Sequence, residues 1–245
     1  MPDLSAADQN LLNIVSANSP TTIASVIQMM QNLDAAMSNN DGLKWFNKLY
    51  LMVTQAIDGA PQQQPWAESA WLTQLDVIFA GLYFTALKGF FSGDPAVPSS
   101  WDALFEARFT PNIDRIQFAL AGMNAHINHD LALALVKTNK QMNLDPAMQS
   151  PQHDDYQRVN GILAQVLPNA LKFLASDALG VAAQDTGKIG RLLAIWDVRV
   201  ARDAAWDFGN HIRTLPAPLL PVALSAQDKL TGVIGRALLL PLQST

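Results

Sequence analysis

Apolar residues recur at helical spacing along almost the whole chain of 245 residues, and this pattern restricts the fold more than any other feature. In "DGLKWFNKLYLMVTQAI", residues 41–57, the residues Leu43, Phe46, Leu49, Tyr50 and Val53 follow this spacing. No segment alternates apolar and polar residues as a half-buried strand does, and no Asn-Gly or Asp-Gly turn joins two alternating runs. We therefore predict an all-α fold, a single compact domain over residues 1–245 with about eight or nine helices.

The predicted helices are separated by short loops rich in proline, glycine or polar residues. They span residues 4–16, 20–37, 41–57, 66–92, 101–108, 112–139, 156–176, 189–213 and 225–240. Breaks such as "APQQQP" at 60–65 and "SGDPAVPSS" at 92–100 cannot continue a helix. Because these breaks are short, we interpret none of them as a linker between domains.

Charge and composition exclude several kinds of partner and chemistry. Only 15% of the residues are charged and the net charge is −5, so the chain lacks the basic surface that binds nucleic acid or an anionic membrane. The absence of cysteine excludes disulfides, thiolate nucleophiles and cysteine-ligated metal sites. The first residues, "MPDLSAADQN", have neither the positive start nor the apolar run of a signal peptide, so we expect a cytoplasmic protein.

One stretch, "WLTQLDVIFAGLYFTALKGFF" at 71–91, is apolar enough to raise the question of a membrane span. Asp76 and Lys88 leave only 11 residues between them, well short of the ~20 that a span needs. We interpret this stretch as a buried core helix and expect no membrane partner.

The most unusual segment is "MNAHINHDLALAL", residues 123–135, because it places five polar side chains in an apolar helix. On a helical wheel, Asn124 and Asn128 lie on one flank of the apolar stripe and His126 and Asp130 on the other, while His129 points away. The stripe itself comprises Leu120, Met123, Ile127, Leu131 and Ala134.

Two roles are open for these polar residues. A His126–Asp130 pair four residues apart can orient an imidazole for acid–base catalysis, bind a metal on one helix face, or form a plain hydrogen-bonded pair. The two asparagine amides can hydrogen-bond to a ligand or to neighbouring helices. The structural alternative has weight, since buried polar groups at helix contacts often only satisfy backbone groups.

The same segment resembles the signature of a bacterial family catalogued as domain of unknown function 5995. The similarity extends over roughly residues 100–241 and includes "HDDYQRVNGIL" at 153–163, "WDVRVARDAAWDF" at 196–208 and "GRALLLP" near the end. The resemblance implies a helical fold but no known activity. It indicates which residues to examine, and from their chemistry we predict His126 and Asp130 as catalytic residues. The predicted substrate-binding residues are Asn124, Asn128, Asp154, Asn160, Trp196, Arg199, Arg202 and Trp206. His129 falls at a variable position of the signature.

The two later segments also have structural interpretations. Asp154 or Asp155 can cap the start of the 156–176 helix. Arg199 and Asp203 can form an i,i+4 pair on a solvated face.

Metal chemistry and nucleophilic catalysis find little support in the sequence. His126 with Asp130, and Asp207 with His211, have the spacing of a helical ligand pair, so a mononuclear divalent metal stays open although we predict no metal. The zinc-dependent phospholipase C fold needs more histidines than the four present, and a di-iron bundle needs glutamates in pairs. No Gly-x-Ser-x-Gly, Walker or dinucleotide-binding motif occurs.

Two classes of function therefore remain. The first is an enzyme that acts on a small hydrophobic substrate by His/Asp acid–base chemistry, through cyclisation, isomerisation or hydrolysis, without an organic cofactor. The second is a non-catalytic helical module that binds an apolar ligand or a partner protein. The sequence gives no indication of the oligomeric state.

Overall fold

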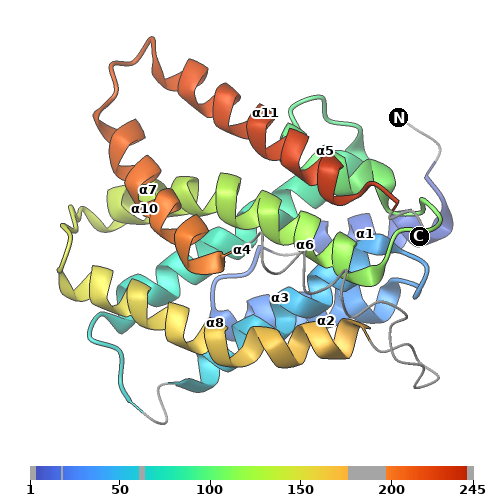
Figure 1. The fold of residues 1–245 in the computed structure, drawn as a ribbon, viewed down its shortest axis with the longest axis horizontal. Helices are drawn as coiled ribbons and strands as arrows, with labels where there is room; N and C mark the ends of the chain where they lie inside the picture. The colour runs from blue at the N-terminus through green and yellow to red at the C-terminus, as the bar shows by residue number, and fades with distance from the viewer. Residues whose placement is uncertain (1–3, 18, 61–63, 176–196, 242–245) are drawn as a thin grey trace.

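The computed structural model describes residues 4–17, 19–60, 64–175 and 197–241 (Figure 1). Within these residues it consists of helices joined by loops and contains no strand, as the all-α prediction expected. The elements are α1 (Ala6–Ala17), α2 (Ile23–Ala36), α3 (Gly42–Gly59), α4 (Ser69–Ser92), α5 (Ser99–Ala107), α6 (Arg115–Ala125), η2 (His126–Asp130), α7 (Leu131–Met142), α8 (Pro151–Ala175), α10 (Val198–Thr214) and α11 (Leu220–Leu238).

The segments α6, η2 and α7 follow one another without a break, so they form one long helix with a π-helical turn in its middle. Counted in this way, the described residues contain nine helices, and the predicted number is confirmed. The predicted helix 156–176 in fact begins at Pro151, and the predicted helix 225–240 begins at Leu220. The described part of the predicted helix 189–213 is α10, which begins at Val198. Residues 189–196 of that prediction lie outside the described residues.

Helix α4 is a core helix, which accounts for its apolar sequence. By length and composition it is the one helix among the described residues that could cross a membrane. In this fold it packs instead against α1, α7, α8 and η2, and eleven of its residues are buried. The apolar run therefore serves helix packing, as the prediction of a core helix expected.

The α6–η2–α7 helix is buried on all sides along α6. Every residue from Ile116 to Ala125 is buried, between α3 on one side and α5 and α11 on the others. Gly122 allows the approach of α3, because a Cβ atom there would lie 2.3 Å from Cγ of Phe46. A helix enclosed in this way must find a partner for each polar side chain that it carries.

Helix α11 lies across α5 and α6 and fixes one end of this arrangement (Figure 1). Its Asp228 accepts hydrogen bonds from the backbone N–H groups of Ser99 and Ser100, both at 2.9 Å, at the start of α5. A carboxylate in this position stabilises the first turn of the neighbouring helix. The helices around the polar segment are thereby held in a defined register.

Candidate active site

The polar segment contains the π-helical turn, which changes the directions of its side chains. The N–H of Leu131 bonds to the carbonyl of His126, five residues earlier, and the extra residue widens the helix. As a result, Nδ1 of His126 and Nδ1 of His129 lie 3.0 and 2.8 Å from the two carboxyl oxygens of Asp130. The helical wheel placed His129 opposite the apolar stripe, whereas in the structure its side chain is mostly buried and faces Asp130.

Asp130 is the centre of a buried hydrogen-bond network. Its Oδ2 accepts from Nε1 of Trp101 at 3.0 Å as well as from His126, and its Oδ1 faces His129. Burial alone would raise the pKa of this carboxyl, but the hydrogen bonds from the two histidines hold the pKa below its usual value. Asp130 is therefore an ionised acceptor that joins η2 to α5.

His126 is held in one tautomer by this carboxylate. An ionised carboxylate only accepts, so Nδ1 of His126 carries the hydrogen and Nε2 carries the free lone pair when the ring is neutral. Burial lowers the pKa of the imidazole despite the hydrogen bond and charge of Asp130. The ring stacks on Phe79, with centroids 3.5 Å apart, and its Nε2 is buried without a hydrogen-bond partner in the described part of the chain.

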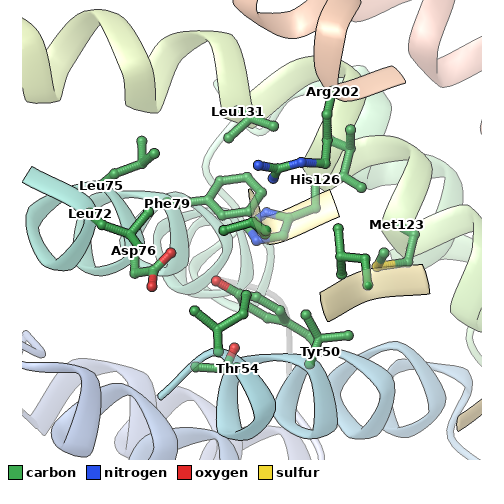
Figure 2. A pocket seen from close by; sticks show the side chains of 15 residues that line it. Tyr50, Thr54, Leu72, Leu75, Asp76, Phe79, Met123, His126, Leu131 and Arg202 are labelled. Carbon is green, nitrogen blue, oxygen red and sulfur yellow. The ribbon is translucent and has the colours of Figure 1, made fainter. Parts of the chain in front are cut away.

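The His126 side chain forms part of the wall of a cavity of about 40 Å³ between α3, α4, η2, α8 and α10 (Figure 2). Most of the wall is apolar, and its polar members are Tyr50, Thr54, Asp76, His126 and Arg202. Five polar groups from four elements thus meet around one small apolar space.

Asp76, like Tyr50 and Thr54, is a member that the sequence analysis did not identify as a site residue. It lies on α4, and Figure 2 shows its carboxyl turned toward the same space as the Tyr50 hydroxyl. Burial raises the pKa of Asp76 to about 7, the positive charge of Arg202 opposes this shift, and the negative charge of Asp58 adds to it. Its Oδ2 has no hydrogen-bond partner among the described residues. The residue is half-buried, with its Oδ2 enclosed. A lone aspartate inside the apolar stretch 71–91 was the available signal, because a carboxyl of raised pKa on a core helix is a candidate for a functional site.

Tyr50 lies between the two titratable groups. Its ring meets the His126 ring edge-on at a centroid distance of 4.5 Å. Burial, followed by the negative charges of Asp76 and Asp130, raises the pKa of the phenol well above its ordinary value. Tyr50 therefore keeps its proton, and its hydroxyl shares a hydrogen bond with Thr54 in the same wall.

Arg202 and Asn160 were both predicted as substrate-binding residues, and the structure brings them together. Nε of Arg202 donates to Oδ1 of Asn160 at 2.7 Å, and Nη2 donates to the carbonyl of Tyr156 at 2.9 Å. Arg202 is buried and contributes to the cavity wall, whereas Asn160 lies behind it, away from the cavity. Asn160 therefore positions the guanidinium.

The other residues predicted on α8 and α10 lie away from the cavity. Trp206 packs against His153, with ring centroids 4.8 Å apart, and against Trp71 and Tyr156. Arg199 is exposed and pairs with Asp197 at 3.6 Å, not with Asp203 as predicted, because Asp203 accepts a hydrogen bond from Gln157 instead. Trp196 lies outside the described residues.

The acidic residues at the start of α8 have different positions from those predicted. Asp154 is exposed on the first turn. The Asp155 side chain does not cap its own helix, because its two oxygens accept from the N–H groups of Ala67 and Glu68 at 3.2 and 2.7 Å. Asp155 thereby ties α8 to the start of α4, and neither residue reaches the cavity.

Asn124 and Asn128 face α11, on the other side of the helix from the cavity. Nδ2 of Asn124 donates to the carbonyl of Thr231 at 2.9 Å, and Oδ1 accepts from Nδ2 of Asn128 at 3.0 Å. Gln227 donates to the carbonyl of Asn128 at 2.6 Å. These contacts favour the structural role for the asparagine pair, and nothing in their position favours substrate binding.

The described residues contain no group of three or more histidine, aspartate or glutamate side chains arranged to hold a metal ion. His126 and Asp130 are hydrogen-bonded to each other, and Asp207 and His211 are exposed on α10. The mononuclear metal site that the sequence left open gains no support from these positions.

The fold and the cavity together define an all-α protein with an oriented imidazole, a carboxyl of raised pKa and a guanidinium in one buried site. The chain belongs to a family of unknown function, DUF5995, whose model matches residues 23–241. The family suggested by the "MNAHINHDLALAL" segment is thereby confirmed. Neither the curated proteins nor the solved structures contain a match to this chain.

Proposed function

We propose that this protein is an enzyme that transfers protons on a small, largely apolar substrate bound in the His126 cavity. The observation that carries the proposal is Nε2 of His126, a buried basic nitrogen that lacks a hydrogen-bond partner while its ring is fixed by Asp130. A buried polar atom without a partner costs about 1–3 kcal/mol. Such a cost is common where a group is kept for chemistry.

In this mechanism Nε2 of His126 is the base. It takes a proton from one atom of the substrate, and the negative charge of Asp130 stabilises the imidazolium that forms. Asp130 does not line the cavity, so it acts as a positioning residue. The predicted catalytic pair thus becomes one catalytic residue and the residue that orients it.

Asp76 is the acid of the mechanism. With a pKa of about 7 it is largely protonated below neutral pH, so it can give a proton to a second atom of the substrate. The net result is an isomerisation or a cyclisation, and the two groups regain their starting states by proton exchange when the product leaves. Hydrolysis would also need a bound water, for which the cavity has room.

A second candidate function is the non-catalytic binding of a small apolar molecule. The observation that favours it is the size of the cavity, about 40 Å³ with mostly apolar walls. Binding without turnover would leave Asp76 and His126 with no chemical role, so the two functions differ in what replacement of these residues does.

The test uses deuterium wash-in, which detects proton transfer without knowledge of the natural substrate. The protein is incubated in D₂O with short-chain ketones, aldehydes and 2-oxo acids, and loss of carbon-bound protons is followed by NMR. We expect exchange with the wild-type protein and at least a hundredfold slower exchange, the lower end of acid–base contributions, in His126→Gln. Asp76→Asn should also be slow.

His153→Gln is the matched control, because His153 is also buried but packs on Trp206 outside the cavity. It should exchange at the wild-type rate. Binding of panel compounds with no exchange would favour the non-catalytic function. If no compound exchanges and none shifts the ¹⁵N resonance of His126, the enzymatic proposal is wrong.

A further inference from the structure

We propose that the substrate of this cavity is a short-chain monocarboxylate whose carboxylate group pairs with Arg202. This inference rests on the proposed function, since it names the class of molecule that the same cavity takes. It follows from three observations: an uncompensated buried cation, a titratable carboxyl in the same wall, and an apolar lining.

The first observation is the charge of Arg202. Its side chain is buried, with 6% of the residue exposed, yet no carboxylate lies within ion-pair distance of it among the described residues. Among the described residues, it donates hydrogen bonds to the neutral oxygens of Asn160 and Tyr156, and the guanidinium carbon lies 4.1 Å from the centroid of the Tyr156 ring. Buried charges are usually paired, because an unpaired one loses its hydration without compensation.

The guanidinium also keeps donors for a ligand. Arginine has five N–H groups, and Arg202 uses one on Nε and one on Nη2 within the described chain. Nη1 and the second N–H of Nη2 make no other hydrogen bond to these residues, and a neighbouring pair of N–H groups is the geometry that binds a carboxylate with two parallel bonds. The side chain is held in place by Asn160 and Tyr156, so little side-chain entropy is lost on binding.

The second observation concerns the charge that the cavity can accept. The charged and titratable groups facing Asp76 are Arg202 from α10, Tyr50 and Asp58 from α3, and His126 from η2. With Asp76 protonated and His126 neutral, the cavity carries one positive charge, which a single carboxylate neutralises. With Asp76 ionised, the carboxylate would be repelled. Binding is therefore coupled to protonation of Asp76.

The third observation limits the rest of the ligand. The apolar part of the wall consists of Val53, Ile57, Leu72, Leu75, Phe79, Met123, Ile127, Leu131, Val159 and Leu163. This lining favours an alkyl group, and the volume of about 40 Å³ restricts it to a few carbons. Phosphate, as a dianion with no apolar part, matches neither the single cation nor the lining.

The experiment compares propionate and butyrate with their uncharged amides by isothermal titration calorimetry. At about pH 6 we expect each acid to bind at least tenfold more tightly than its amide. Above about pH 7 the affinity should fall about tenfold per pH unit, because the fraction of protonated Asp76 falls by that factor. Asp76→Asn should keep the binding and lose this pH dependence.

Arg202→Gln should lose the preference for acid over amide, and Arg199→Gln, an exposed arginine three residues earlier on the same helix, should keep it. If Arg202→Gln does not fold, the test is the pH dependence of carboxylate affinity, which should be present in the wild type and absent in Asp76→Asn. Equal binding of acid and amide, a pH dependence that survives Asp76→Asn, or no binding of either acid at millimolar concentration would overturn the inference. Carboxylate binding without deuterium exchange would refute only the proposed function, and exchange on uncharged ketones alone would refute only this inference.

Discussion

Replacement of Asp76 by asparagine gives the sharpest test of the site, because it needs no substrate. The pKa of this carboxyl is about 7 in the folded protein, against an ordinary value of 3.8. An acid whose pKa is raised by folding binds its proton more tightly in the folded state. The wild-type protein should therefore lose stability as the pH rises from about 4 through 7, and the loss should be complete above about pH 8.

The size of this loss follows from the shift of about three pKa units. At 1.36 kcal/mol per unit, the ionised Asp76 lowers the free energy of unfolding by at most about 4 kcal/mol. Asparagine has nearly the same shape and does not ionise. At pH 8 the Asp76→Asn protein should therefore be more stable than the wild type, by up to roughly 10 °C in Tm for a domain of this length. At pH 4 the two proteins should melt at nearly the same temperature.

Urea unfolding followed by circular dichroism, at several pH values between 4 and 8.5, measures this difference directly. Asp154→Asn is the matched control, since Asp154 is exposed on the first turn of α8 and its replacement should change stability by less than about 1 kcal/mol at every pH. A parallel pH dependence in wild type and Asp76→Asn would refute the assignment of Asp76 as an acid of raised pKa. The same assignment would be refuted if the wild type were more stable than Asp76→Asn at pH 8.

Three further predictions concern the helix that carries the polar segment. In ¹⁵N NMR, His126 should titrate below its ordinary pKa of 6.5, because burial lowers the pKa, and its neutral form should be the Nδ1–H tautomer. His129 should titrate above 6.5, because burial lowers its pKa by less than the hydrogen bond and charge of Asp130 raise it. The contribution of His129 to stability is therefore lost as the pH rises through that raised pKa. The opposite order would contradict the network. Asn124→Ala should lower the free energy of unfolding by about 1–3 kcal/mol, since the carbonyl of Thr231 loses its donor. The rate of deuterium exchange on the substrate should stay unchanged in the folded variant. Loss of this exchange without loss of stability would show instead that Asn124 binds the substrate. Gly122→Ala should unfold the protein or lower its Tm by more than Asn124→Ala does, because the new Cβ would clash with the Phe46 ring. If the Gly122→Ala variant melts at the same temperature as the wild type, α3 does not pack against α6 as described.

The helices could be predicted from the sequence because helical periodicity is a local property. Prolines and glycines marked most of the ends, but α8 and α11 began well before their predicted starts at residues 156 and 225. At α8 the misleading signal was the polar run that precedes Tyr156, which was interpreted as a loop. It is the first turn of the helix, in which Asp154 is exposed while the buried Asp155 binds the start of α4.

The site could be predicted only where its residues are close in sequence. His126 and Asp130 lie four residues apart, so their contact was visible in the spacing. Asp76 and Arg202 reach the same cavity from α4 and α10, more than a hundred residues apart, and no local pattern relates them. The π-helical turn was also hidden, because the sequence "HINHD" contains neither proline nor glycine to mark it.

The position of the long central helix explains why so many polar groups gather in residues 123–135. A helix enclosed on all sides cannot leave a polar group to solvent, so its asparagines bind α11 and its aspartate binds α5. The two histidines use their Nδ1 atoms on that aspartate, and the other nitrogen of His129 lies 3.8 Å from Asp228. Only Nε2 of His126 is left over, and its ring is part of the wall that also holds Asp76 and Arg202. A purely structural segment would have no reason to keep that nitrogen, since a carbon in its place would fill the same space without an unmet hydrogen bond.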